Sequence, residues 1–321
     1  MEEHETTPDV HPSFTAPAPG AMGPPATRPG DCAVPPMGRA DPDRPVVEVV
    51  SRALLRDLTG MVRHEPGTRR GEDPEELHQM RVATRRLRST LRTYRPVLQA
   101  DWADALRARL RTTAEALGTV RDLDVLVQRL AAEDLDGPAV AGRAQLDGIL
   151  STRRQAARER LLAVLDDPDH AALLTELRSA AHAPRCLDPA GPAGPQLAPL
   201  ATRAWKRLRK AERTMAPHDV RIRVKRLRYA AEAIEPAFGK PARRLAARAA
   251  DAQDVLGEYQ DAWVARQVYL ELLDEQPLRT EAAFTIGVLV ARADAAMATA
   301  RQAWPDVWDR LRAKKRRRFL A

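Results

Sequence analysis

The sequence has few aromatic residues and few cysteines. Only 4% of its 321 residues are aromatic, and the two cysteines, Cys32 and Cys186, lie far apart in proline-rich segments. Scarce aromatics together with many Ala, Leu and Arg residues favour helices over sheets. Two distant cysteines exclude a disulfide framework and a cysteine-based metal site. The sequence also lacks an uninterrupted apolar run of about 18 residues, which a membrane-spanning helix would need.

The N-terminus and the charge balance narrow the class of protein further. The first ten residues, MEEHETTPDV, are too acidic and polar for a secretory signal peptide, so we expect a soluble, cytoplasmic protein without a membrane partner. The chain has 52 Lys and Arg residues against 44 Asp and Glu, a net charge of +8. This excess favours polyanions such as nucleic acid, an anionic membrane surface or polyphosphate, without choosing among them.

Proline residues mark the expected boundaries along the chain. Clusters of proline near the N-terminus and in the middle of the chain predict a disordered leader and a linker. Elsewhere apolar residues recur at helical spacing, and no segment alternates as a strand would. We predict an all-α fold with two bundles of several helices each. The expected units are a leader at 1–45, a first bundle at 46–183, a linker at 184–199 and a second bundle with a basic tail at 200–321.

Two segments of the chain each recur further along it, the first at an offset of 140 positions and the second at an offset of 139. HQMRVATRRLRSTLRTYRP at 78–96 aligns with HDVRIRVKRLRYAAEAIEP at 218–236, and ALGTVRDLDV at 116–125 aligns with VLGEYQDAWV at 255–264. Both copies of the first segment keep His-x-x-Arg-x-x-x-basic-Arg-Leu-Arg, although most surrounding residues differ. The recurrence indicates an internal duplication.

Each copy of the first segment places basic residues along one face of a helix. At 100° per residue, five basic residues of the first copy fall in a stripe roughly 80° wide and about four turns long, with apolar residues opposite. No acidic residue lies between Leu77 and Ala100 to neutralise the first stripe. The stripes comprise His78, Arg81, Arg85, Arg88 and Arg92 in the first copy and His218, Arg221, Lys225 and Arg228 in the second.

An unmixed basic stripe is unfavourable unless an anion binds it. Exposed helix faces usually mix charges, because opposite pairs at i, i+4 gain about 0.2–0.5 kcal/mol and like pairs lose a similar amount. A bound anion removes this repulsion, and the planar guanidinium group matches phosphate geometry. A solvated helix face is the alternative interpretation. For His78 and His218 three roles stay open: a phosphate contact, a structural role, and a metal ligand, which the neighbouring arginines disfavour.

The stripes suit a chain of phosphates better than they suit nucleic-acid bases. Base readout needs a recognition module, and single strands need aromatic stacking platforms. Tyr229 is the one aromatic residue beside either stripe. We therefore predict linear polyphosphate as the partner. A nonspecific nucleic-acid-binding protein and a condensed-phosphate hydrolase are the alternatives.

No catalytic constellation or cofactor motif accompanies the stripes. The sequence has no P-loop, and the nearest candidate metal ligands are Asp122 and Asp124, with Asp261 as the counterpart of Asp122. We expect these carboxylates to pair with arginines of the stripes. The prediction is a binding protein that is not an enzyme and has no cofactor, catalytic residue or metal.

The two duplicated segments together resemble the two halves of a CHAD domain, a histidine-containing all-α domain, over roughly residues 46–321. The resemblance implies two antiparallel four-helix-type bundles with pseudo-twofold symmetry around a basic central cavity that binds inorganic polyphosphate, often at polyphosphate granules. It places the family's basic positions on both stripes. Arg121 is a further candidate, although its counterpart is Gln260. Arg203 and Arg207, on the helix before His218, are expected to face either the cavity or solvent.

Overall fold

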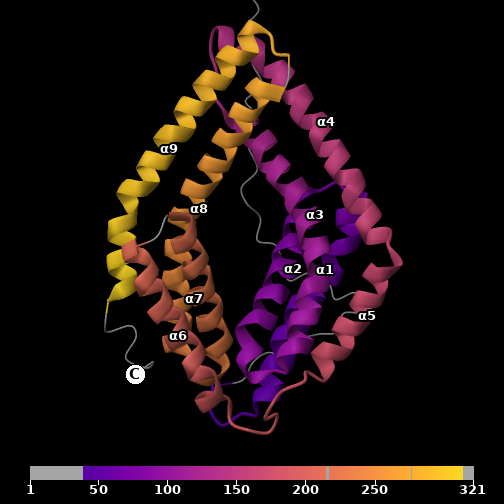
Figure 1. The fold of residues 1–321 in the computed structure, drawn as a ribbon, viewed down its shortest axis with the longest axis vertical. Helices are drawn as coiled ribbons and strands as arrows, with labels where there is room; N and C mark the ends of the chain where they lie inside the picture. Colours follow the sequence, from indigo (N-terminus) through magenta and orange to yellow (C-terminus); the bar gives the residue numbers. More distant parts are fainter. Residues whose placement is uncertain (1–38, 215–216, 276, 314–321) are drawn as a thin grey trace, which may run out of the picture. The chain divides into compact units, whose positions relative to one another are not determined.

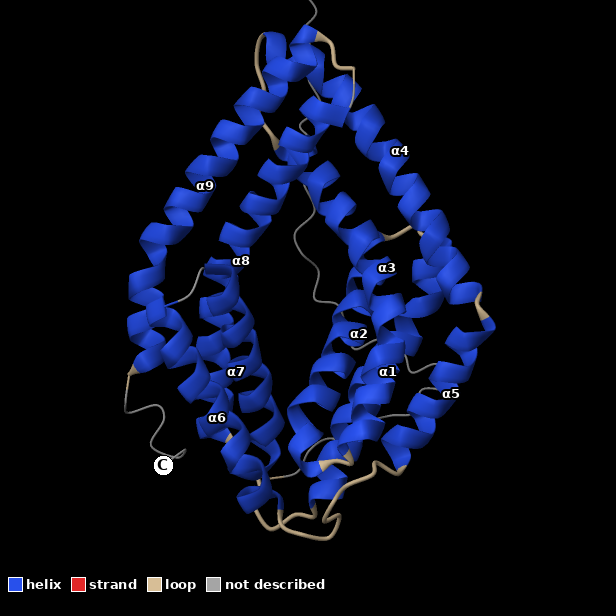
Figure 2. Ribbon diagram, in the orientation of Figure 1, coloured by secondary structure: helices blue, strands red, loops and turns tan. Residues whose placement is uncertain are grey.

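A computed structural model describes residues 39–214, 217–275 and 277–313 of the chain. Residues 1–38 of the predicted leader and the basic tail lie outside these ranges. The described residues form helices without a strand, apart from two isolated bridges, as Figure 2 shows. The all-α prediction is confirmed. The helices are α1 (Val46–Arg70), α2 (Pro74–Tyr94), α3 (Ala100–Ala132), α4 (Pro138–Asp166), α5 (Pro168–His182), α6 (Ala193–Thr214), α7 (Pro217–Phe238), α8 (Lys240–Glu275) and α9 (Thr280–Arg312).

The order of the helices repeats along the chain. Helices α2 and α7 carry the two basic stripes, and α3 and α8 carry the two copies of the second duplicated segment. Within each set of four, α1–α4 and α6–α9, each helix packs against the next one. Figure 1 shows the two sets on opposite sides, with α2 and α7 on the inner side of each. The sets also contact each other directly, α2 against α7 and α4 against α9.

Helix α2, which carries the first stripe, has a well-defined start. Gly71 ends α1 with a positive φ of 75°, a conformation that glycine adopts without strain. Asp73 then caps α2, because its side chain accepts a hydrogen bond of 2.8 Å from the backbone N–H of Glu75. Pro74 follows at the first helical position, where its missing N–H has no helical partner.

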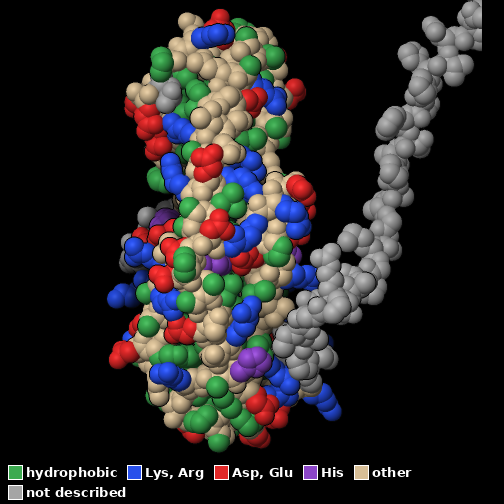
Figure 3. Space-filling view, turned by 90° about the vertical axis from the view of Figure 1, so that its right-hand side faces the viewer, with side chains coloured by type: hydrophobic (Ala, Val, Ile, Leu, Met, Phe, Trp, Pro, Cys, Tyr) green, Lys and Arg blue, Asp and Glu red, His purple; other side chains and the backbone are tan. Residues whose placement is uncertain are grey.

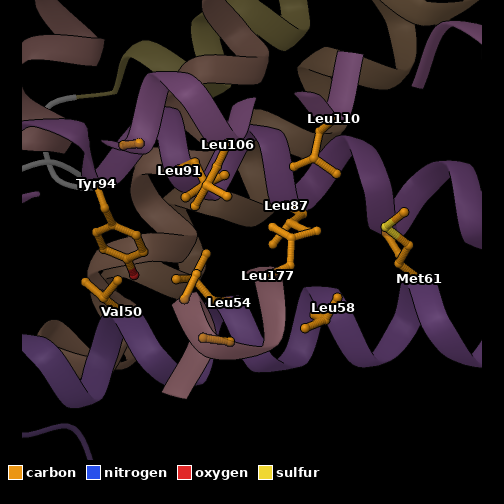
Figure 4. Packing of buried hydrophobic residues seen from close by; sticks show 14 of the residues in the cluster. Val50, Leu54, Leu58, Met61, Leu87, Leu91, Tyr94, Leu106, Leu110 and Leu177 are labelled. Atoms are coloured by element: carbon orange, nitrogen blue, oxygen red, sulfur yellow. The ribbon is translucent and has the colours of Figure 1, made fainter. Parts of the chain in front are cut away.

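Buried apolar residues hold the helices together in three clusters. In the largest, side chains from α1, α2, α3 and α5 interdigitate, among them Leu54, Leu87, Leu106 and Leu177 (Figure 4). A second cluster joins α6, α7, α8 and α9. The third joins the far ends of α3 and α4 to the far ends of α8 and α9. The largest cluster also includes Leu200 of α6 and Ile234 of α7, so the two sets of helices share a core at both ends and are not independent bundles.

Helix α9 is long and apolar enough, by length and composition alone, to cross a membrane. In the structure it packs along α8 and α4. Ile286 and Leu289 of α9 are buried in the third cluster. Part of its apolar surface is thus buried within the described part of the chain, whereas Phe284 is exposed.

Helix α6 begins at Ala193, inside the stretch predicted as a linker. Pro195 lies in its first turn, where the backbone N–H would lack a helical partner in any case, so it does not prevent a helix. Pro199 lies inside the helix. The proline-rich composition predicted that the second bundle begins at residue 200, whereas its first helix begins at Ala193.

Residues 39–45, predicted to belong to a disordered leader, pair with the segment before α6. The backbone N–H of Gly194 donates to the carbonyl of Pro42 at 2.7 Å, and Pro45 forms a bridge with Pro192. Extended proline segments retain their carbonyl acceptors, so they can pair in this way. The folded part of the chain thus includes residues that the proline count assigned to the leader.

A candidate anion-binding cavity between α2 and α7

A cavity of about 580 Å³ lies between the N-terminal halves of α2 and α7, with α3 and α8 forming its other walls. The duplicated pattern supplies equivalent residues from both helices. The first three members of each stripe, far apart in the sequence, thus face one cavity. Its basic lining residues are His78, Arg81, Arg85, Arg121, His218, Arg221 and Lys225. Figure 3 shows the outer side that carries α4 and α5, where Lys and Arg side chains are interspersed with Asp and Glu.

Carboxylates of α3 and α8 also line the cavity. Asp122 of α3 forms an ion pair with Arg81, with 3.2 Å between Nη2 and Oδ1. Asp261, its counterpart on α8, acts with its negative charge on Arg221. The expected pairing of these carboxylates with stripe arginines is therefore seen for Asp122. The cavity is basic along α2 and α7 and mixed along α3 and α8.

Two acidic lining residues, Asp254 and Glu258, were missed from the sequence. They precede Asp261 on the same helix at spacings of seven and three residues. Such spacings place side chains on one face of an α-helix. Extending the helical projection back from VLGEYQDAWV would have found both.

Several polar atoms at the cavity are buried without a hydrogen-bond partner in the described part of the chain. They are Nε of Arg85, Nε of Arg221 and Nδ1 of His78. A buried donor without a partner costs about 1–3 kcal/mol. Oxygen atoms of a bound anion would accept hydrogen bonds from such donors.

Burial and neighbouring positive charges lower the pKa values of several cations in the cavity. Desolvation, followed by the positive charges of Arg221 and Arg85, lowers the pKa of Lys225 to about 7. Desolvation also lowers the pKa of Arg81 and of Arg221. For His78, desolvation and then the charge of Arg121 lower the pKa below its ordinary value. A ligand with negative charge would reverse these shifts.

The two cavity histidines differ in their surroundings. His218 Nδ1 lies 2.8 Å from Oε1 of Gln260, which places the proton on Nδ1 when that amide oxygen accepts. The counterpart of Gln260 is Arg121, which repels a proton on His78. Among the described residues, no group of three or more His, Cys, Asp and Glu side chains is arranged to hold a metal ion.

Comparison with known proteins identifies the family. The CHAD domain profile matches residues 52–270. The chain belongs to the CHAD domain family.

Solved structures and curated sequences agree with this assignment. The CHAD domain from the plant Ricinus communis is 28% identical, with a TM-score of 0.70 over 87% of this chain and 95% of that one. PptA from Streptomyces chartreusis shares the fold, with 22% identity and a TM-score of 0.69 over 83% of this chain and 99% of its own.

Two uncharacterized Mycobacterium tuberculosis proteins, Rv2226 and MT2285, are each 31% identical over 289 residues, or 82% of this chain. That alignment covers 52% of each relative, so the chain spans about half of their length.

In this CHAD domain the later members of both stripes leave the cavity. Tyr94 at the end of α2 donates a hydrogen bond of 2.9 Å to the carbonyl of Ala233, so α2 and α7 meet at their C-terminal halves. Arg228 does not line the cavity: it donates to Glu232 of its own helix at 2.8 Å and, at 3.5 Å, to Gln253 at the cavity wall. Arg88 lies near Arg107 of α3, whose charge lowers its pKa after desolvation. A straight helical projection could not show where the two helices converge.

Three further predicted residues also lie outside the cavity. Arg92, Arg203 and Arg207 line a separate, smaller pocket between α2, α6 and α7. Asp124 is buried and accepts a hydrogen bond of 2.5 Å from Nε of Arg154 on α4, which is not a stripe residue. Its part is structural, because it anchors α4 to α3.

Proposed function

We propose that this CHAD domain binds inorganic polyphosphate in the cavity between α2 and α7 and thereby associates with polyphosphate granules in the cytoplasm. The observation that carries the proposal is that two equivalent basic stripes line one cavity. Nε of Arg85 and Nε of Arg221, one from each stripe, are buried there without a partner in the described residues. A chain of phosphates supplies both the negative charge and the acceptors that these groups lack.

The lining favours polyphosphate over nucleic acid. None of the described side chains that line the cavity is Phe, Tyr or Trp, so bases would find no large stacking platform. Tyr229, the aromatic residue beside the second stripe, lines a different pocket next to α1. A base-free phosphate chain needs no such platform.

We infer binding without hydrolysis. Hydrolysis of a condensed phosphate ordinarily uses carboxylates that hold Mg²⁺ opposite the phosphate. Here Asp122 is paired with Arg81, and Glu258 lies 3.7 Å from Arg129, so two of the four carboxylates neutralise arginines. Incubation with polyphosphate and Mg²⁺ should release no phosphate above background; sustained turnover would identify an enzyme.

The test is the double variant Arg81→Glu with Arg221→Glu. A charge-assisted hydrogen bond contributes about 1.5–3 kcal/mol, so losing two should weaken polyphosphate binding at least about 100-fold. Lys206→Glu with Arg209→Glu is the matched control, because it changes the same number of charges at exposed positions of α6.

Circular dichroism and thermal melting check that both variants fold. Arg85→Gln with Arg221→Gln repeats the test without new negative charges. A folded cavity variant that binds as well as the control would refute the cavity as the site.

Competition separates polyphosphate from nucleic acid. Long-chain polyphosphate should displace duplex DNA, and DNA at equal phosphate concentration should not displace polyphosphate. Equal competition would contradict the proposal. A fluorescent fusion should colocalise with polyphosphate granules in cells, and the cavity variant should be diffuse.

A further inference from the structure

A second basic pocket lies on the same two helices, at the C-terminal end of α2 and the middle of α7. It has a volume of about 120 Å³ and is walled by α2, α6 and α7. All of its charged lining residues are arginines. They are Arg92 of α2, Arg203 and Arg207 of α6, and Arg223 and Arg226 of α7.

These five arginines differ from the cavity cations in having no carboxylate among them. Within the described residues, none of the five forms an ion pair or a side-chain hydrogen bond, and no Asp or Glu lines the pocket. Nε of Arg226 is buried without a partner. Desolvation, followed by the charges of Arg92, Arg223 and Arg207, lowers the pKa of Arg226 to about 10. The pocket therefore concentrates positive charge that the described residues leave uncompensated.

The duplication supplies an internal comparison. VVSRALLR at 49–56 in α1 matches LATRAWKR at 200–207 in α6, with the two arginines in equivalent places. The equivalent arginines of α1 line a pocket of about 400 Å³ against α2 and α7, together with Arg86, the counterpart of Arg226. This pocket, however, also contains Glu232 and Glu235. Glu232 occupies the position equivalent to Arg92.

The comparison shows that the fold does not require an unmixed pocket. On the α1 side the same architecture accommodates carboxylates, and Arg56 is paired with Asp57 at 2.8 Å. On the α6 side an arginine replaces the glutamate, and Arg223 adds a further charge where the first copy has Ala83. Like charges brought together without a structural need indicate a site for an anion.

We propose that the arginine pocket between α2, α6 and α7 is a second phosphate site, which holds another part of a condensed phosphate chain. The proposal rests on the proposed function of the cavity. The pocket is too small for a nucleotide and has no aromatic lining residue in the described part, whereas several guanidinium forks suit phosphate oxygens. Arg85 and Arg92 are two turns apart on α2, about 10 Å along the axis, so one long chain can reach both sites.

Basic residues also lie between the two sites. Arg107 of α3 lowers the pKa of both Arg88 and Arg92, in each case after desolvation, so it is close to both. Arg88 stands between the cavity residue Arg85 and the pocket residue Arg92 on the same helix. A phosphate chain passing from the cavity to the pocket would therefore meet Arg88 and Arg107 on the way, although Arg107 also pairs with Asp104 at 2.8 Å.

The pocket variant is the double substitution Arg203→Glu and Arg207→Glu. Its control is the double substitution Lys206→Glu and Arg209→Glu on the same helix, because all four residues are exposed and only the first two line the pocket. Calorimetry with long-chain polyphosphate should show about tenfold or greater weakening for the pocket variant and less than about threefold for the control. With tripolyphosphate, the wild-type protein should bind two molecules per chain and the pocket variant one. Equal affinities and stoichiometries for pocket variant and control would overturn the second site.

The cavity variant makes the two proposals separately refutable. Arg81→Glu with Arg221→Glu should keep one tripolyphosphate, and adding the two α6 substitutions should remove it. If the cavity variant keeps both molecules, the proposed function of the cavity fails while the pocket stands. If the pocket variant keeps both, the pocket fails and the cavity stands. The double substitution Arg203→Lys and Arg207→Lys preserves charge. It should bind polyphosphate more tightly than the corresponding double glutamate variant.

Discussion

The affinity of this CHAD domain for polyphosphate should depend on pH through Lys225. Its neighbours are Arg221 on its own helix and Arg85 and Arg81 on α2, with Asp261 of α8 acting in the opposite direction. Desolvation and these like charges lower its pKa to about 7 in the free protein. At neutral pH the side chain is therefore about half protonated.

A bound polyphosphate chain favours the charged form and should raise this pKa toward its ordinary value near 10.4. Above a pH of about 7, binding then takes up a proton at Lys225. Affinity should fall as pH rises, by up to about tenfold per pH unit between about pH 7 and 9. Below about pH 7 the ammonium group is already formed, so this residue adds no further dependence. His78, whose pKa is lowered, adds affinity only on the acidic side.

Isothermal titration calorimetry with long-chain polyphosphate from about pH 6 to 9 measures the slope, and buffers of different ionisation enthalpy count the protons taken up. Lys225→Arg is the matched variant, because arginine occupies the equivalent position, Arg85, in the first stripe. It should bind at least as tightly and flatten the profile above neutral pH. A wild-type profile without a slope, or an unchanged slope in the arginine variant, would refute the reasoning.

Two further predictions concern shape and stability. Gly257 lines the cavity with open space around its Cα, so Gly257→Leu should narrow the cavity and weaken polyphosphate binding about tenfold without changing charge. Leucine favours helix by about 0.8 kcal/mol over glycine, so the melting temperature should not fall; Gly148→Leu, on an exposed part of α4, is the control. Tyr94→Phe leaves the carbonyl of Ala233 without its partner and should destabilise the protein by about 1 kcal/mol in urea unfolding. An unchanged midpoint would mean that this contact between α2 and α7 contributes nothing to stability.

The sequence predicted the helices well because their signals are local. Apolar spacing and the proline and glycine boundaries each span only a few turns of one helix, and the duplication is found by comparing two such short segments. The segment before α6 was the exception, since proline composition cannot show that Gly194 and Ala193 pair with residues near Pro42. Those hydrogen bonds join parts of the chain that are distant in sequence.

The candidate site was predicted in part for the same reason. His78, Arg81 and Arg85 share a helical face because the backbone repeats every 3.6 residues, and the second copy followed from the repeat. The same helical projection would also have identified the acidic residues of α8. It could not show that Arg92 lies outside the cavity, because that depends on the angle at which α2 meets α7.

The sequence alone thus determined the all-α class, the duplication and the basic faces of two helices, since these depend on spacing within single helices. The tertiary structure decided which residues share a space. It placed residues of both stripes around one cavity, and the acidic residues of α3 and α8 in the other walls of that cavity. It also brought Arg92 together with the arginines of α6 in a second pocket, because α2 and α7 separate at one end and converge at the other.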